Sequence, residues 1–89
     1  MLLSEHSALV TGAANRLGAQ IARTLHQNGA NLIIHYRASR AAAQTLVGEL
    51  NRERAGSAVA IAADLAVDGA IEELARQACS AFGGLHLLV

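Results

Sequence analysis

Several residue types are missing or scarce in this chain of 89 residues. It contains no proline, tryptophan or lysine, and aromatic residues make up only 2%. The one cysteine, Cys79, excludes an intramolecular disulfide and fits a reducing compartment. We expect its side chain to be a small buried hydrophobe. Acidic and basic residues number seven each and are spread along the chain, which indicates neither nucleic acid nor a membrane surface as a partner.

The amino terminus lacks the features of a signal peptide. No basic segment precedes its apolar residues, and Glu5 and His6 interrupt them before a run of sufficient length develops. We therefore expect a cytoplasmic protein that is neither secreted nor membrane-spanning. The four histidines show no metal-ligand spacing, so we assign no metal.

Short apolar runs alternate with helical patterns along the chain. Hydrophobic residues make up 53% of the sequence and are mostly small or aliphatic, a composition typical of parallel strands covered by helices. The runs predict strands at 7–12, 31–36, 56–64 and 85–89. This βαβαβαβ order predicts the α/β class with a Rossmann-type doubly wound parallel sheet, in which the strands lie in the order 3-2-1-4.

Each helical pattern has one apolar face, and Ser39 is a plausible N-cap for the second helix. The predicted faces consist of Leu17, Ile21 and Leu25 in the first helix, of Ala42, Leu46 and Leu50 in the second, and of Ile71, Leu74, Ala78 and Phe82 in the third.

The last strand, 85–89, is purely apolar and would form an unprotected edge of the sheet. We therefore expect residues 1–89 to be the amino-terminal, dinucleotide-binding part of a larger single domain. The alternative is a complete small domain that shields this strand in a dimer.

The segment "TGAANRLG", 11–18, follows the first strand and opens the first helix. Free backbone N–H groups and the helix dipole can hold a pyrophosphate at such a place. Gly12 permits the tight turn, and Gly18 lets the helix pack close to the strand. Arg16 stands where a glycine is usual, and its planar side chain could bind phosphate oxygens and also flank a flat ring. The alternative is that Arg16 is a solvated residue at the start of the helix.

Two further strand ends carry candidate ligand-binding residues. An acidic residue that would bind the ribose of NAD is replaced by Tyr36 and Arg37 at the end of the second strand. With no carboxylate there to repel a 2′-phosphate, we expect NADPH, which favours reduction. The candidate donors to that phosphate are Arg37, Ser39 and Asn15. The alternative is that Arg37 is an ordinary surface cation. Asp64 follows the third strand, where open α/β sheets bind ligands, or else it is a cap or turn acid.

The loop "TGAANRLG", the "ADL" at 63–65 and "GGLHLLV" at 83–89 resemble the short-chain dehydrogenase/reductase family over the whole chain. Arginine in the loop together with "HYRAS" at 35–39 resembles its pteridine reductase branch, although Ala38 stands where that branch tends to carry a basic residue. In this branch the loop arginine bridges cofactor and pterin, and the resemblance implies that Asp64 accepts from the adenine amino group. The cofactor-binding residues that it implies are Gly12, Asn15, Arg16, Leu17, Gly18, Tyr36, Arg37, Ser39, Asp64 and Leu65.

The resemblance also implies an activity. The whole protein would be an NADPH-dependent oxidoreductase that reduces a pterin, such as a dihydropteridine or dihydrofolate-like substrate, and would form a dimer or tetramer of identical chains. The family's catalytic Ser, Tyr and Lys have no counterpart in these residues, so we assign no catalytic residue to this chain. The alternatives are a 3-oxoacyl thioester, sugar or carbonyl reductase of the same family, and a non-catalytic NADP(H)-binding sensor module.

Overall fold

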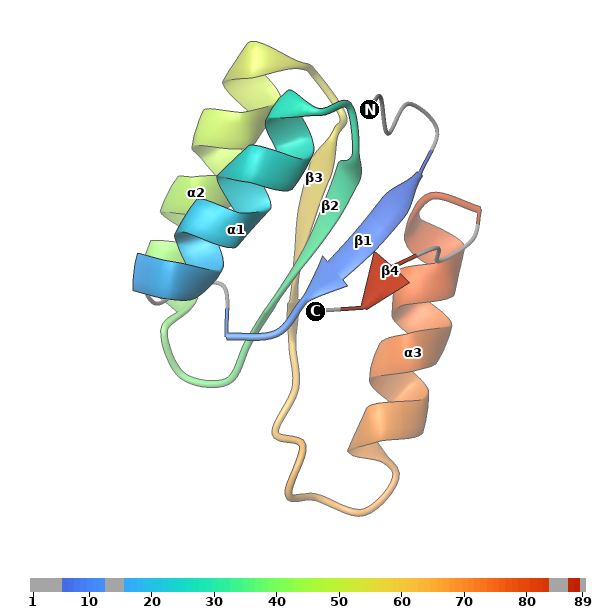
Figure 1. Cartoon of the computed structure of the whole chain (residues 1–89). Helices are drawn as coiled ribbons and strands as arrows, with labels where there is room; N and C mark the ends of the chain where they lie inside the picture. Colours follow the sequence, from blue (N-terminus) through green and yellow to red (C-terminus); the bar gives the residue numbers. More distant parts are fainter. Residues whose placement is uncertain (1–5, 13–15, 84–86, 89) are drawn as a thin grey trace.

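A computed structural model of the chain describes residues 6–12, 16–83 and 87–88. Within them, strands and helices alternate in the predicted order (Figure 1). The elements are β1 (Ser7–Val10), α1 (Arg16–Gln27), β2 (Asn31–Tyr36), α2 (Arg40–Glu53), β3 (Ala58–Ala62), α3 (Ala70–Ala81) and β4 (Leu87–Leu88). None of the described helices is long and apolar enough to cross a membrane.

The four described strands form one parallel sheet in the order β3-β2-β1-β4. β1 pairs with β2 from Ser7↔Asn31 onward, β2 with β3 from Leu32↔Ala58, and β1 with β4 from Ala8↔Leu87. Parallel neighbours are joined by a crossover connection, here a helix, which explains why β1, β2 and β3 are each followed by one. The predicted strand order is confirmed, and the direction of winding reverses between β1 and β4.

Helices cover both faces of the sheet, as the doubly wound prediction requires (Figure 1). α1 and α2 pack on one face, where Leu32 and Ile34 of β2 are fully buried against them. α3 packs on the opposite face, where Leu74 and Ala78 contact the cluster around Ile33. Side chains alternate between the two faces along β2, so one strand contributes to both cores.

Four predictions of burial are wrong. On α1, Leu17 is 73% exposed, and the buried residues are Gly18, Ala22 and His26. The inner face of α2 contains Ala43 rather than Ala42, because Ala43 shares one side of the helix with Leu46 and Leu50. On α3, Ile71 is 61% exposed, since the first turn of this helix extends past the carboxyl end of β1 (Figure 1). Cys79 is exposed as well, because its neighbour in sequence occupies the face toward the sheet.

The amino end of β3 is held by Asn51 of α2. Its Oδ1 accepts hydrogen bonds from the N–H groups of Ser57 and Ala58, both at 2.9 Å, and its Nδ2 donates to the Ala58 carbonyl at 3.0 Å. Ser57 and Ala58 are buried, so these groups would otherwise lie in the core without a partner. Gly56 makes the preceding turn with φ of +70°, a conformation that favours glycine. The register of β3 on β2 is thereby fixed from its first residue.

Candidate dinucleotide-binding edge

The loop after β1 combines a glycine turn with the start of a helix. Gly12 has φ of +65°, which agrees with its predicted role in the tight turn. Gly18 is buried in the first turns of α1, as expected of a residue that lets the helix pack closely. Asn15 lies outside the described residues. Because α1 begins at Arg16, its first N–H groups lie at the carboxyl edge of the sheet, next to the point where the winding reverses.

The helices differ in the charge of their first turns. α1 and α2, which follow β1 and β2, have no acidic residue there. α3 has two, Glu72 and Glu73. An acidic side chain near a helix N-terminus offsets the positive end of the dipole. The first turns of α1 and α2 carry no such compensation, which leaves them suited to an anionic ligand.

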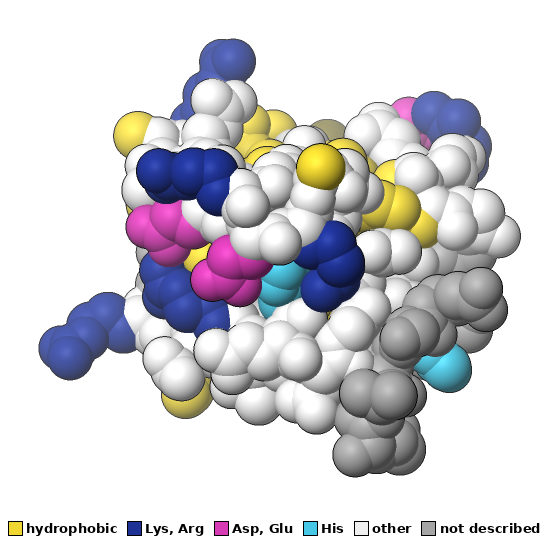
Figure 2. Space-filling model, turned by 90° about the horizontal axis from the view of Figure 1, so that it is seen from above, with side chains coloured by type: hydrophobic (Ala, Val, Ile, Leu, Met, Phe, Trp, Pro, Cys, Tyr) yellow, Lys and Arg dark blue, Asp and Glu magenta, His cyan; other side chains and the backbone are white. Residues whose placement is uncertain are grey.

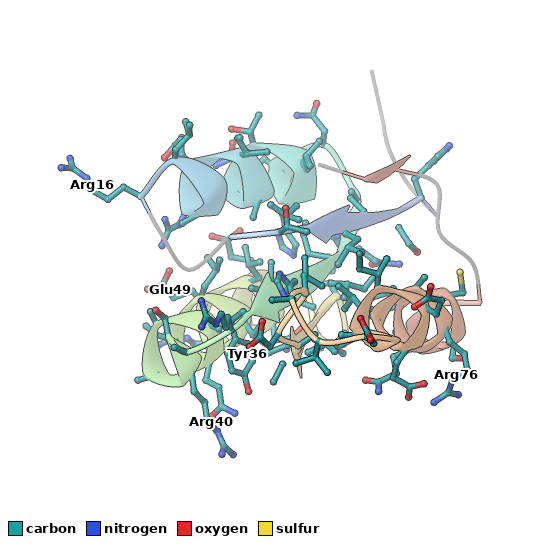
Figure 3. The ribbon with its side chains drawn as sticks, turned by 90° about the horizontal axis from the view of Figure 1, so that it is seen from below. Arg16, Tyr36, Arg40, Glu49 and Arg76 are labelled. Atoms are coloured by element: carbon teal, nitrogen blue, oxygen red, sulfur yellow. The ribbon has the colours of Figure 1, made fainter. Side chains whose placement is uncertain are left out.

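Arg16 and Leu17 are exposed at the start of α1, and Leu17 is 73% exposed. Figure 3, which shows the carboxyl edge of the sheet, places Arg16 extended outward and away from Tyr36 and Arg40. None of the ion pairs between described residues includes Arg16. Its side chain is therefore available to a ligand at this edge, and its predicted contact with a pyrophosphate stays a prediction.

The end of β2 presents one packed and two exposed side chains. Tyr36 is half-buried and packs against the core beneath α1 and α2. Arg37 and Ser39 are exposed in the turn that leads to α2. Ser39 occupies the predicted N-cap position, but its side chain makes no capping hydrogen bond. The Ser39 hydroxyl is thus not used by the helix that it precedes.

Asp64 lies in the turn after β3, beside Arg37. Its Oδ1 accepts a hydrogen bond from the Ala66 N–H at 3.0 Å, and its Oδ2 lies 3.6 Å from Nε of Arg37. The expectation that no carboxylate lies near the end of β2 is wrong, since the turn after the neighbouring strand supplies one. Asp64 does act as a turn acid, and its oxygens still have unused lone pairs. Leu65, 38% exposed, follows it.

His35 connects the ends of β2 and β3. It is 6% exposed and packed, as its position on a buried strand suggests. Its Nε2 donates to the Ala63 carbonyl at 2.8 Å, and the Ala63 N–H donates to the Tyr36 carbonyl at 3.0 Å. Both backbone groups of Ala63 are therefore bonded to β2, directly before Asp64. The sequence did not indicate this contact.

A second polar cluster lies at the opposite, amino end of the sheet, where basic, acidic and histidine side chains gather on one face (Figure 2). Nε2 of His26 is 2.7 Å from Oγ of Ser57, and its Nδ1 is 3.6 Å from Oε2 of Glu53. The order serine, histidine, carboxylate resembles that of an activated nucleophile. Ser57, however, is 1% exposed, and its hydroxyl lies 2.5 Å from the Arg54 carbonyl, to which it donates. This cluster therefore stabilises the fold.

A doubly wound sheet with a glycine turn at the reversal point places the chain in the Rossmann class of α/β proteins. The family model for short chain dehydrogenase matches residues 6–89. The chain belongs to this family, as its sequence motifs predicted.

Known relatives are similar to this chain in sequence or structure over most of the chain's length. Pteridine reductase 1 of Leishmania tarentolae is 42% identical, over 83% of this chain and 29% of that protein. A 3-oxoacyl-[acyl-carrier-protein] reductase of Staphylococcus epidermidis is 35% identical, over 93% and 34% respectively. The crystal structure of a short chain dehydrogenase from Burkholderia cenocepacia in complex with NADP is 36% identical, with a TM-score of 0.91, over 99% of this chain and 36% of that one. The chain thus spans about a third of the length of the relatives that it matches.

Proposed function

We propose that this chain is the dinucleotide-binding part of an NADPH-dependent reductase. The observation that carries the proposal is the end of β2, where an exposed arginine and a free serine hydroxyl precede a helix without acidic residues in its first turn. Such a place suits the 2′-phosphate that distinguishes NADPH from NADH. The NADP held by the similar Burkholderia cenocepacia enzyme supports the same choice.

The residues would bind three groups of the cofactor: the pyrophosphate, the 2′-phosphate and the adenine. Gly12, Gly18 and the start of α1 would hold the pyrophosphate, together with Arg16. Arg37 and Ser39 would bind the 2′-phosphate, with Tyr36 beside them. The adenine would lie against Asp64 and Leu65. Leu17 and Asn15, the latter outside the described residues, would complete the proposed contacts on the loop side.

NADPH supplies the hydride in such a reaction, and the protein orients the cofactor. The residues of this chain would fix the adenine half and the pyrophosphate, and thereby the direction in which the nicotinamide extends. Arg16, next to the pyrophosphate, would reach toward a flat substrate.

A pterin is the proposed substrate, on the strength of Arg16 in the loop and of the similarity to pteridine reductase 1. A 3-oxoacyl thioester is the second candidate, because the carrier-protein reductase of Staphylococcus epidermidis is similar over a larger share of the chain. We also propose, from the family, that the whole protein is a cytoplasmic homo-oligomer.

The test is a titration of the full-length protein with NADPH and NADH, in the wild type and in two variants. Hydrogen bonds to charged groups contribute about 1.5–3 kcal/mol, which is roughly a 10- to 150-fold change in affinity. Arg37→Ala should lower the NADPH/NADH preference by about tenfold, the lower end of this range, because solvent screens an exposed arginine. Arg16→Gly should weaken both cofactors alike and keep their ratio within about threefold.

The two variants are controls for each other, since each removes one arginine from the same edge. A collapse of the ratio in Arg16→Gly but not in Arg37→Ala would mean that the roles are exchanged. If neither variant changes cofactor affinity, this edge is not the binding site. Arg16→Gly should in addition impair KM or kcat with dihydrobiopterin, whereas a 3-oxoacyl thioester should be less affected.

A further inference from the structure

The contact between Arg37 and Asp64 joins two loops that are 27 residues apart in sequence but adjacent at the edge of the sheet. The arginine side chain is 75% exposed and the aspartate side chain 41% exposed. Asp64 approaches the Nε edge of the guanidinium group. No hydrogen bond from a described residue involves the two terminal nitrogens of Arg37, so they could still bind a phosphate.

The carboxylate is the better fixed of the two groups. Ala63, directly before it, is bonded to β2 through both of its backbone groups, and Oδ1 of Asp64 is engaged by the Ala66 N–H. Arg37 has a long side chain with no second partner among the described residues. The negative charge therefore stays at this place whether or not Arg37 moves toward a ligand.

We propose that Asp64 is a specificity-determining residue that opposes Arg37 and lowers the protein's preference for the 2′-phosphorylated dinucleotide. This inference rests on the proposed function, in which Arg37 binds the 2′-phosphate. A phosphate on the terminal nitrogens of Arg37 would share that guanidinium group with the carboxylate. It would also feel the repulsion of a fixed negative charge. The guanidinium group of Arg37 would thus interact with two anions, the phosphate and the Asp64 carboxylate.

The size of the effect follows from Coulomb's law. A guanidinium group between two anions keeps them roughly 7 Å apart, a distance close to the Debye length of about 8 Å at physiological salt. For a dianionic phosphate in water, the screened repulsion corresponds to about a two- to fivefold loss of affinity. NADH lacks this phosphate, so the whole effect falls on the ratio between the two cofactors.

The experiment compares wild type with Asp64→Asn by calorimetric titration of NADPH and NADH. As a second pair of probes we would use adenosine 2′,5′-bisphosphate and adenosine 5′-monophosphate, which differ only in the 2′-phosphate. Asparagine keeps an oxygen for the Ala66 N–H but removes the charge. The preference for the phosphorylated ligand should rise about two- to fivefold at low salt, and the rise should vanish near 1 M salt, where the Debye length is about 3 Å.

Glu49→Gln is the matched control. Glu49 pairs with Arg23 at 2.6 Å, its side chain is 40% exposed, and it lies on α2 about 13 Å along the helix from Arg40. Removing this charge should leave the ratio unchanged. An unchanged ratio in Asp64→Asn would overturn the inference and assign Asp64 to the adenine alone. A lower ratio would overturn it too, because Asp64 would then orient Arg37 for the phosphate. If Arg37→Ala leaves the ratio unchanged, the proposed function itself fails, whatever Asp64→Asn does.

Discussion

Replacing Asn51 by alanine should destabilise the fold by removing the side chain that holds the start of β3. Two buried N–H groups, those of Ser57 and Ala58, lose their acceptor at 2.9 Å. An unsatisfied buried donor costs about 1–3 kcal/mol. Because Asn51 is only half-buried, water can reach part of the site, and we take the lower end of this range, about 1–1.5 kcal/mol for each group and so about 2–3 kcal/mol for the two.

The helix partly offsets this loss. Alanine has a higher helix propensity than asparagine, which returns about 0.5 kcal/mol within α2. The net destabilisation is therefore about 2 kcal/mol, a large share of the stability of a small domain. Urea unfolding followed by circular dichroism measures it. Gln44→Ala is the control, since Gln44 is exposed on the same helix, and alanine there should stabilise by a few tenths of a kcal/mol. A free energy of unfolding for Asn51→Ala within about 0.5 kcal/mol of wild type would refute the reasoning.

Two further predictions concern pH and glycine. Burial lowers the pKa of His26 below 6.5, Arg54 adds to the effect, and Glu53 opposes it. The unfolded chain then binds the proton more readily than the folded chain, so the free energy of unfolding should be highest above pH 6.5 and fall as the pH drops below 6.5. His26→Gln should reduce this pH dependence in thermal unfolding. An equal pH dependence in the variant would assign the effect to other titratable groups. Gly48 lies in α2 with open space where a Cβ would be added, so Gly48→Ala should stabilise the fold by about 1 kcal/mol. Gly56 has φ of +70°, so Gly56→Ala should destabilise the fold by about 1–2 kcal/mol. Urea midpoints that shift in the same direction for both variants would contradict this.

The sequence predicted the strand order because alternation and crossover rules leave few topologies. It failed where neighbouring residues are chemically alike. The run of alanines at 41–43 gives no contrast between the inner and outer sides of α2, and so the face was assigned to Ala42 instead of Ala43. On α3, hydrophobic spacing alone placed Ile71 in the core, but the position of the helix relative to the end of the sheet decides its burial.

The site was predicted residue by residue, but not as a set of contacts. Gly12 and Gly18 follow local rules of backbone conformation and packing, and so their conformation could be anticipated. The contact of Arg37 with Asp64 depends on the register of β3 against β2, and a single sequence does not specify which side chains meet across two loops. The same applies to the bond from His35 to the Ala63 carbonyl.

The two ends of the sheet differ in how completely their polar groups are satisfied. At the amino end, Asn51 and the buried pair His26 and Ser57 bond backbone and side-chain groups within the core. At the carboxyl end, the exposed Arg37 is held among the described residues only by one long ion pair with Asp64, which contributes little to stability. Groups that must exchange their partners for a ligand cannot also be tightly bound by the protein. Substitutions at the amino end should therefore change the free energy of unfolding, and those at the carboxyl end the choice between cofactors.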